Sequence, residues 1–308
     1  MLLRPIVIGL KKSYLLDDEI YFLKSYKPLG VILFKRNIIN KKQIKTFISE
    51  IKKILGNKAI IMIDQEGGKV NRLSHSDWSE FPPANLFGNI ALQNIKLAKH
   101  KTYTNYTKIG KELANIGISH NCAPILDLKV KGSNEVIGSR AFSRDPIIVT
   151  TLAKQACKAL IKQNIFPVIK HIPGHGRAKE DSHLSLPEIN LSCKQLEEDF
   201  FPFRQLNSMP FAMTAHIKYN KIDSKYCATF SKKIISTIIR NKIGFKGILF
   251  SDDLCMKALK GEYFERARKA IEAGCDVVLH CNGDLNKTAK SAEGSGFISD
   301  GLKKNIYK

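Results

Sequence analysis

The chain has 308 residues, 44% of them hydrophobic and 25% charged, which is typical of a globular protein and excludes a disordered one. The formal charge of +22 is high enough to suggest a nucleic-acid or anionic-surface partner. The lysines are scattered, however, with pairs such as Lys41 and Lys42 or Lys232 and Lys233 and no long basic block. We therefore expect a diffusely basic surface and no specific nucleic-acid partner.

Cysteine usage and hydropathy bear on the compartment. The seven cysteines are an odd number without framework spacing, which favours reduced thiols in the cytoplasm. No CxxC pair occurs, so we expect no cysteine-based zinc site. No apolar run is long enough to cross a membrane, and the N-terminus lacks the basic start and small-residue cleavage site of a signal peptide. We expect a cytoplasmic protein with no membrane partner.

Short apolar runs rich in β-branched residues recur along the whole chain. Because they are nearly continuous rather than alternating, they predict strands that are buried on both faces of a parallel sheet. The eight runs are Pro5–Gly9, Gly30–Phe34, Ala59–Asp64, Ile118–Ala123, Phe166–His171, Phe211–His216, Gly247–Ser251 and Cys275–Cys281.

Longer segments between these runs carry apolar residues three and four positions apart, which predicts helices. The clearest are Lys41–Leu55, Ile95–Asn115, Pro146–Gln163, Ser231–Asn241 and Glu262–Ala273. Eight strands alternating with helices predict a single (β/α)₈ barrel of the TIM type over residues 1–308, with room for one irregular or shortened element. An open doubly wound sheet is the alternative, disfavoured because no glycine-rich dinucleotide turn follows the first strand.

Four of the predicted strands end in polar side chains. These are Asp64 after the third, Lys170 and His171 after the fifth, His216 after the sixth, and Asp252 and Asp253 after the seventh. In a barrel the carboxyl ends of the strands share one mouth, where active sites form. One polar ending would more often be a turn or cap, but four together predict a single polar pocket.

A long polar segment, HIPGHGRAKEDSH, follows the fifth predicted strand. Long loops in compact domains are usually functional. Asp181 and His183 are two residues apart, so the carboxylate can hold the imidazole in one tautomer and raise its proton affinity, as a general acid/base needs. A solvated loop histidine is the alternative for such a short motif. His175 in the same loop is either a second base or a turn residue.

Five segments are highly specific in combination, above all the pattern KH-x-PGHG-x₄-DSH together with FSDD. They are IDQEGGKVNRL (Ile63–Leu73), IGSRAFSRDP (Ile137–Pro146), KHIPGHGRAKEDSH (Lys170–His183), MTAHI (Met213–Ile217) and FSDDLCM (Phe250–Met256). In order and spacing they resemble the bacterial β-N-acetylhexosaminidases of glycoside hydrolase family three, and the likeness covers nearly the whole chain.

This resemblance implies a role for each matching residue. It implies that Asp252 is the nucleophile that forms a glycosyl–enzyme intermediate, and it alone prefers Asp252 over Asp253. It also implies that His183 is the acid/base, with Asp181 as its partner. The positions that match the family's sugar-binding residues are Asp64, Arg72, Arg140, Lys170 and His171.

The single-domain members of the family recycle cell-wall muropeptides in the cytoplasm. The resemblance therefore implies a retaining exo-β-N-acetylglucosaminidase that removes terminal GlcNAc from GlcNAc-1,6-anhydroMurNAc, with or without peptide. We expect a monomer whose partner is this small saccharide, with no cofactor and no metal.

Three alternatives remain. A β-N-acetylglucosaminide phosphorylase on the same scaffold would use phosphate in place of water, because a neutral histidine donor repels phosphate less than a carboxylate does. A metal-dependent hydrolase would draw ligands from the polar loop and strand ends, but no HxH or HExxH pair sits on one element. A basic nucleic-acid-binding protein would bind with a steep salt dependence.

Overall fold

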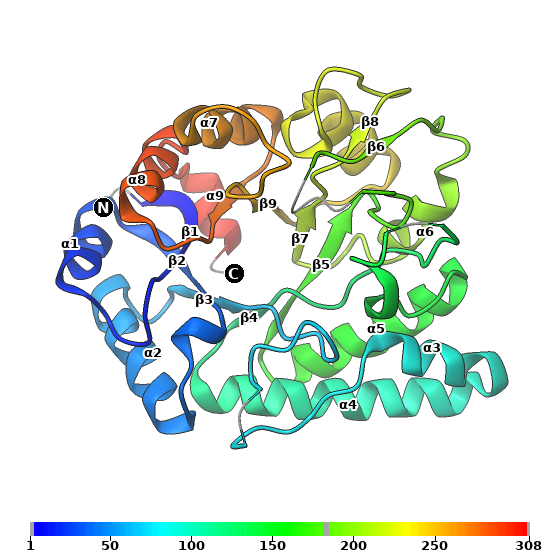
Figure 1. Ribbon diagram of the computed structural model, residues 1–308, viewed down its shortest axis with the longest axis horizontal. Coiled ribbons are helices and arrows are strands. Elements are labelled where there is room, and N and C mark those ends of the chain that lie inside the picture. The colour runs from blue at the N-terminus through cyan, green and yellow to red at the C-terminus, as the bar shows by residue number, and fades with distance from the viewer. Residues whose placement is uncertain (1–2, 75, 133, 181–184, 307–308) are drawn as a thin grey trace.

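The computed structural model describes residues 3–74, 76–132, 134–180 and 185–306. Parallel strands close into a barrel in the order β1-β10-β9-β7-β5-β4-β3-β2 (Figure 1). They are β1 (Arg4–Gly9), β2 (Pro28–Leu33), β3 (Ile60–Ile63), β4 (His120–Asn121), β5 (Phe166–Ile172), β7 (Phe211–Thr214), β9 (Ile248–Asp253) and β10 (Val277–His280). Pairing of Ile6 with Val278 joins the first strand to the last. The predicted (β/α)₈ barrel is confirmed, and the open sheet is wrong.

Helices surround the barrel, with α4 and α5 packed side by side along one flank (Figure 1). The α-helices are α1 (Asp17–Tyr26), α2 (Lys41–Leu55), α3 (Ala84–Gln93), α4 (Ile95–Ile116), α5 (Pro146–Lys162), α6 (Glu197–Gln205), α7 (Tyr263–Ala273), α8 (Leu285–Gly294) and α9 (Asp300–Ile306). Short 3₁₀ turns cover Lys35–Asn37, Gly138–Arg140 and Ala228–Phe230. A small sheet outside the barrel pairs β6 (Glu188–Ile189) with β8 (Lys218–Tyr219).

One predicted helix is irregular. The segment expected as an α-helix over Ser231–Asn241 forms a π-helix over Ile234–Lys242, with Ile243 N donating to Ile238 O across five residues. The Ser231 hydroxyl accepts from Ile234 N at 3.0 Å and so caps the start of this segment. Asp145 likewise caps α5, accepting from Ile147 N at 2.7 Å.

The continuous apolar strands are explained by two layers of packing. Side chains of successive strand residues point to opposite faces. Val7 therefore packs inside the barrel with residues such as Met62 and Phe250, whereas Ile6 and Ile8 pack between the barrel and the helices. Both faces of each strand are buried, so nearly every strand position is apolar.

Helix α9 closes the end of the barrel at which the strands begin. Ile306 belongs to the interior cluster, and Ile298 and Leu302 pack against it. Ile298 N donates to Leu3 O at 2.9 Å, just before β1. The other end, where the strands finish, is left for the polar loops.

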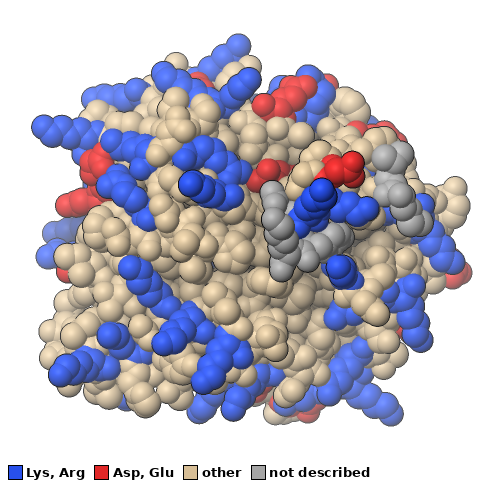
Figure 2. All heavy atoms as spheres, turned by 180° about the vertical axis from the view of Figure 1, so that it is seen from behind, with Lys and Arg blue, Asp and Glu red and all other residues tan. Residues whose placement is uncertain are grey.

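The basic charge is spread over the surface, as expected from the sequence. Figure 2 shows lysine and arginine side chains across one whole face in separate groups, with fewer acidic side chains among them.

Candidate active site

A cavity opens at the carboxyl ends of the barrel strands. Six of the eight predicted site residues line it: Asp64, Arg72, Arg140, Lys170, His171 and Asp252. The remaining two, Asp181 and His183, lie outside the described residues. The cavity therefore collects side chains from the ends of β3, β5 and β9 and from the loop before α5, as the polar strand endings predicted.

The loop after β3 folds back on itself to bring Arg72 over Asp64. Gly67 adopts a left-handed φ of 98°, which a residue with a side chain rarely does. The side chain of Gln65 accepts from Arg72 N at 2.9 Å and so fixes the returning strand. Arg72 Nη2 then lies 3.3 Å from Asp64 Oδ2.

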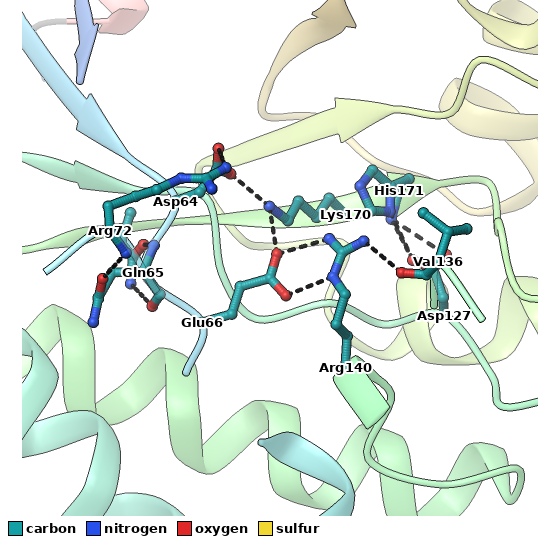
Figure 3. A network of polar contacts seen from close by, with 10 residues as sticks. Asp64, Gln65, Glu66, Arg72, Asp127, Val136, Arg140, Lys170 and His171 are labelled. Carbon is teal, nitrogen blue, oxygen red and sulfur yellow. Dashed lines mark hydrogen bonds and ion pairs between the residues drawn. The ribbon is translucent and has the colours of Figure 1, made fainter. Parts of the chain in front are cut away.

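Lys170 projects from β5 between two carboxylates (Figure 3). Its Nζ is 2.7 Å from Asp64 Oδ1 and 2.8 Å from Glu66 Oε1. Burial by itself would lower the pKa of Lys170, but Asp64 and Glu66 outweigh it and raise the pKa above its usual value. The ammonium group is held charged at a fixed place in the cavity wall.

Glu66 also binds Arg140 through two parallel hydrogen bonds. Arg140 Nε and Nη2 each lie 2.8 Å from one carboxylate oxygen of Glu66, and Nη1 donates to Val136 O at 3.0 Å. Figure 3 shows that one chain of alternating charges runs from Arg72 through Lys170 to Arg140. Sequence reasoning missed Glu66. The available signal was a carboxylate two residues after a predicted site aspartate, inside a motif of the family.

The two acidic members of this network stay ionised although they are buried. Burial would raise the pKa of Glu66, but Arg140 and Lys170 lower it to about 2. Burial acts on Asp64 in the same way, and Lys170 and Arg72 hold its pKa well below the usual value. The network is therefore a set of fixed charges across the working pH range.

His171 is anchored by a buried carboxylate that the sequence analysis did not single out. Its Nδ1 lies 2.7 Å from Oδ2 of Asp127, which follows β4. The side chain of Asp127 is 0% exposed. The ring of His171 lines the cavity beside Lys170, so the adjacent residues of the KH motif both face the site.

His175 is not merely a turn residue, because it is buried and lines the cavity. Its ring lies 5.5 Å from that of His171, centroid to centroid. Burial and His171 lower its pKa to about 4. The following Gly176 packs against the backbone of Leu128, where a Cβ would lie 2.1 Å from the carbonyl oxygen, so this loop position requires glycine.

Asp252 is the next-to-last residue of β9, and it lines the cavity. Its Oδ1 accepts from Asp253 N at 2.8 Å, and its own backbone N–H donates to Thr214 Oγ1 at 3.3 Å. Burial would raise the pKa of Asp252, but His216 and His171 hold it below its usual value. An ionised carboxylate on a rigid strand end has the properties of a nucleophile.

The neighbouring carboxylate, that of Asp253, accepts hydrogen bonds from two backbone N–H groups. Asp253 Oδ1 accepts from Cys255 N at 2.9 Å and from Cys281 N at 3.1 Å, so it ties two backbone segments together. Burial raises the pKa of Asp253. The geometry thus favours Asp252 over Asp253 as the reactive group, a choice that the residues alone left open.

His216 is buried behind the cavity wall rather than lining it. Its Nε2–H donates to the carbonyl oxygen of Asp253 at 3.0 Å, and the Thr229 hydroxyl lies 2.7 Å from Nδ1. Burial lowers the pKa of His216, and the nearby carboxylate of Asp252 opposes that shift. The expectation that every polar strand ending faces the pocket is therefore wrong for His216, which supports β9 from behind.

Among residues 3–74, 76–132, 134–180 and 185–306, no three or more His, Cys, Asp or Glu side chains gather in an arrangement that could hold a metal ion. Nor does any helix within those ranges combine the length and apolarity needed to cross a bilayer.

Residues 15–300 match the family model of the glycosyl hydrolase family 3 N terminal domain. The chain belongs to this family. A β-hexosaminidase of Neisseria gonorrhoeae is 38% identical over 284 residues, which cover 90% of this chain and 78% of that protein. A β-hexosaminidase of Thioalkalivibrio sulfidiphilus is 35% identical, over 92% of this chain and 82% of that protein. The structure of NagZ from N. gonorrhoeae in complex with N-trifluoroacetyl-D-glucosamine superimposes with a TM-score of 0.87 and 33% identity, covering 99% and 97% of the two chains.

Membership of glycosyl hydrolase family 3 confirms the family that the sequence motifs indicated. The protein is a glycosidase of the β-hexosaminidase type, so the prediction of an enzyme acting on saccharides is confirmed.

Proposed function

We propose that the protein is a retaining exo-β-N-acetylglucosaminidase of peptidoglycan recycling. Its substrate is GlcNAc-1,6-anhydroMurNAc, with or without peptide, from which it removes the terminal GlcNAc. The observation that supports this most is that Asp252 shares one cavity with the charged network of Asp64, Lys170 and Arg140. Similarity to a NagZ that binds a glucosamine derivative favours an amino-sugar ligand.

Hydrolysis proceeds in two displacements at the anomeric carbon. The Asp252 carboxylate attacks that carbon while His183, paired with Asp181, delivers a proton to the departing oxygen. The bond to the leaving sugar breaks, and a covalent ester between the GlcNAc residue and Asp252 remains. His183 then removes a proton from water, which attacks the same carbon and restores the carboxylate. Two inversions give net retention.

The charged network holds the sugar in place for this attack. Hydrogen bonds that involve a charged donor or acceptor are about twice as strong as neutral ones. An epimer that cannot reach Lys170 or Asp64 leaves buried polar groups unpaired and is rejected. Arg72, Arg140 and His171 extend the same set of donors and acceptors around the ring.

Water, rather than phosphate, is the acceptor in this proposal. In the described part of the cavity wall each cation is already paired: Arg72 with Asp64, Lys170 with Asp64 and Glu66, and Arg140 with Glu66. A phosphate ion would have to approach these carboxylates and Asp252, and like charges repel it.

We further propose a cytoplasmic monomer in which residues 1–308 form one catalytic domain that acts without cofactor or metal. The odd number of cysteines, without the spacing of a disulfide framework, supports a reducing compartment.

One assay tests the proposed reaction. The enzyme is given 4-nitrophenyl N-acetyl-β-D-glucosaminide, with the corresponding glucoside as control, and NMR identifies the first anomer released. The β anomer with little glucoside cleavage is expected. Release of the α anomer contradicts retention, and a sugar 1-phosphate formed in phosphate buffer assigns the protein as a phosphorylase. Parallel turnover of GlcNAc-1,6-anhydroMurNAc tests the natural substrate.

A further inference from the structure

A fully buried carboxylate lies directly behind the cavity wall. Asp127 Oδ1 accepts from His175 N at 2.6 Å, and His171 N lies 3.3 Å from both oxygens of the carboxylate. The second oxygen, Oδ2, faces His171 Nδ1 at 2.7 Å. The three donors belong to the KH-x-PGH segment, so this single carboxylate organises both histidines of the cavity wall.

The protonation state of this carboxylate determines where the ring hydrogen of His171 resides. Burial would raise the pKa of Asp127, but His171 and then His175 hold it below the usual value. An ionised carboxylate only accepts hydrogen bonds. The contact at 2.7 Å therefore requires the hydrogen to sit on Nδ1 of His171.

His171 presents the opposite edge of the same ring to the cavity. His171 lines the cavity, and with Nδ1 turned to Asp127 the ring presents Nε2 on its far edge. In a neutral ring with hydrogen on Nδ1, that nitrogen is an acceptor. The same cavity holds the donors Arg72, Arg140 and Lys170 and the acceptors Asp64 and Asp252, and Nε2 adds a neutral acceptor beside Lys170.

We infer that Asp127 is a positioning residue, which fixes the tautomer of His171 so that Nε2 accepts a hydrogen bond from a sugar hydroxyl. This inference rests on the proposed function, because the hydroxyl belongs to the bound GlcNAc. Asp127 does not line the cavity, and its proposed effect on the substrate passes through the imidazole of His171.

The isosteric variant Asp127→Asn is expected to reverse this arrangement. The short contact from His175 N still needs an acceptor, so the amide oxygen takes the place of Oδ1, where it also remains within reach of His171 N. The amide nitrogen then replaces Oδ2 and points a donor at Nδ1. His171 must accept there, and its hydrogen moves to Nε2. The ring now presents a donor to the cavity, which is the wrong polarity for the hydroxyl.

Histidine tautomers are read directly by long-range ¹H–¹⁵N NMR of ¹⁵N-histidine-labelled full-length protein without substrate. The His171 signals are assigned by their loss in His171→Gln. We expect hydrogen on Nδ1 in the wild type and on Nε2 in Asp127→Asn. A wild-type spectrum with hydrogen on Nε2 overturns the inference, even where Asp127→Asn does not fold. Because this measurement needs no turnover, it stands or falls separately from the proposed function.

Kinetics provide the second readout. We expect Asp127→Asn to lower kcat/KM on the aryl N-acetylglucosaminide by roughly 10- to 100-fold, the effect of one mispaired polar group. The matched control is Asp276→Asn, whose carboxylate accepts from Arg240 and Leu249 N outside the cavity; its kcat/KM should stay near the wild-type value.

A double variant separates positioning from a general structural role. If Asp127 acts only through His171, the variant Asp127→Asn with His171→Gln should be no slower than His171→Gln alone. Losses that multiply in the double variant would mean that Asp127 acts independently of the ring, and they would overturn the inference.

Discussion

Glu66 and Arg140 meet through two parallel hydrogen bonds of 2.8 Å, and the same carboxylate lies 2.8 Å from Lys170. One acidic side chain thus orients two of the cations proposed to bind the sugar. Because Arg140 and Lys170 come from different elements, Glu66 makes the sugar site a single preorganised unit rather than a set of independent contacts.

Glu66→Gln should therefore weaken substrate binding more than it slows the chemical step. The amide keeps the size of the side chain but removes the charge that holds Arg140 and Lys170. We expect KM for the aryl N-acetylglucosaminide to rise about 10-fold or more, and stability to fall by roughly 3–5 kcal/mol, as when one partner of a buried ion pair is lost. Steady-state kinetics and urea unfolding measure both. Glu265→Gln, which removes an exposed partner of Arg268, is the control and should change neither appreciably.

Substitutions of the two adjacent aspartates of β9 should have different effects, one on turnover and the other on stability. Asp252→Ala should abolish turnover without unfolding the barrel, because it removes the nucleophile. Asp253→Asn should instead lower the melting temperature, since it weakens the link between Cys255 N and Cys281 N. The folded fraction should still form a glycosyl–enzyme intermediate detectable by mass spectrometry. If Asp252→Ala retains activity, Asp252 is not the nucleophile.

The acid role of His183 is tested by leaving groups. His183→Ala should slow the cleavage of sugars with poor leaving groups, such as alkyl or disaccharide aglycones, far more than that of 4-nitrophenyl or more acidic phenols, which depart without protonation. A series of aryl glycosides gives the dependence of kcat/KM on leaving-group pKa. Equal losses across the series would be incompatible with proton donation by His183.

The loss of folding stability at acid pH should reveal the contribution of the ionised Glu66 carboxylate. The pKa of Glu66 falls from an ordinary 4.5 to about 2 in the folded protein, so folding favours its ionised form. The resulting stabilisation is complete above pH 4.5 and is lost as the pH falls toward 2. Asp64 and Asp127 act in the same direction. The difference in unfolding free energy between wild type and Glu66→Gln should shrink over this window; a difference that is constant with pH would contradict the assignment.

The barrel was predictable because its signal is local. All eight strands lie within or next to their predicted apolar runs, although β4 is assigned only over His120–Asn121 of the run Ile118–Ala123. The long helices α2, α4, α5 and α7 were also recognised, to within a residue at each end. The helices α1, α3, α6, α8 and α9 were not, because with seven to ten residues they contain too few turns for periodicity to stand out.

The residues that hold the site residues in place, Glu66 and Asp127, could not be predicted from the sequence alone. Glu66 pairs with Arg140, which lies 74 residues later in the chain, and Asp127 pairs with His171, which lies 44 residues later. No local pattern reveals such partners, because only closure of the barrel brings them together. His216 shows the converse: a polar residue after a strand looked like a pocket residue, but the backbone turns it behind β9.

The plug that α9 places in the amino end of the barrel has a consequence for how the molecule assembles. Because α9 follows every strand in chain order, the inner apolar layer around Val7 and Phe250 remains open to water until Ile306 docks. The barrel itself closes only once β10 has been made and pairs with β1, so docking of α9 is the step that finally shields this layer, and the hydrogen bond from Ile298 N to Leu3 O fastens the segment before α9 to β1.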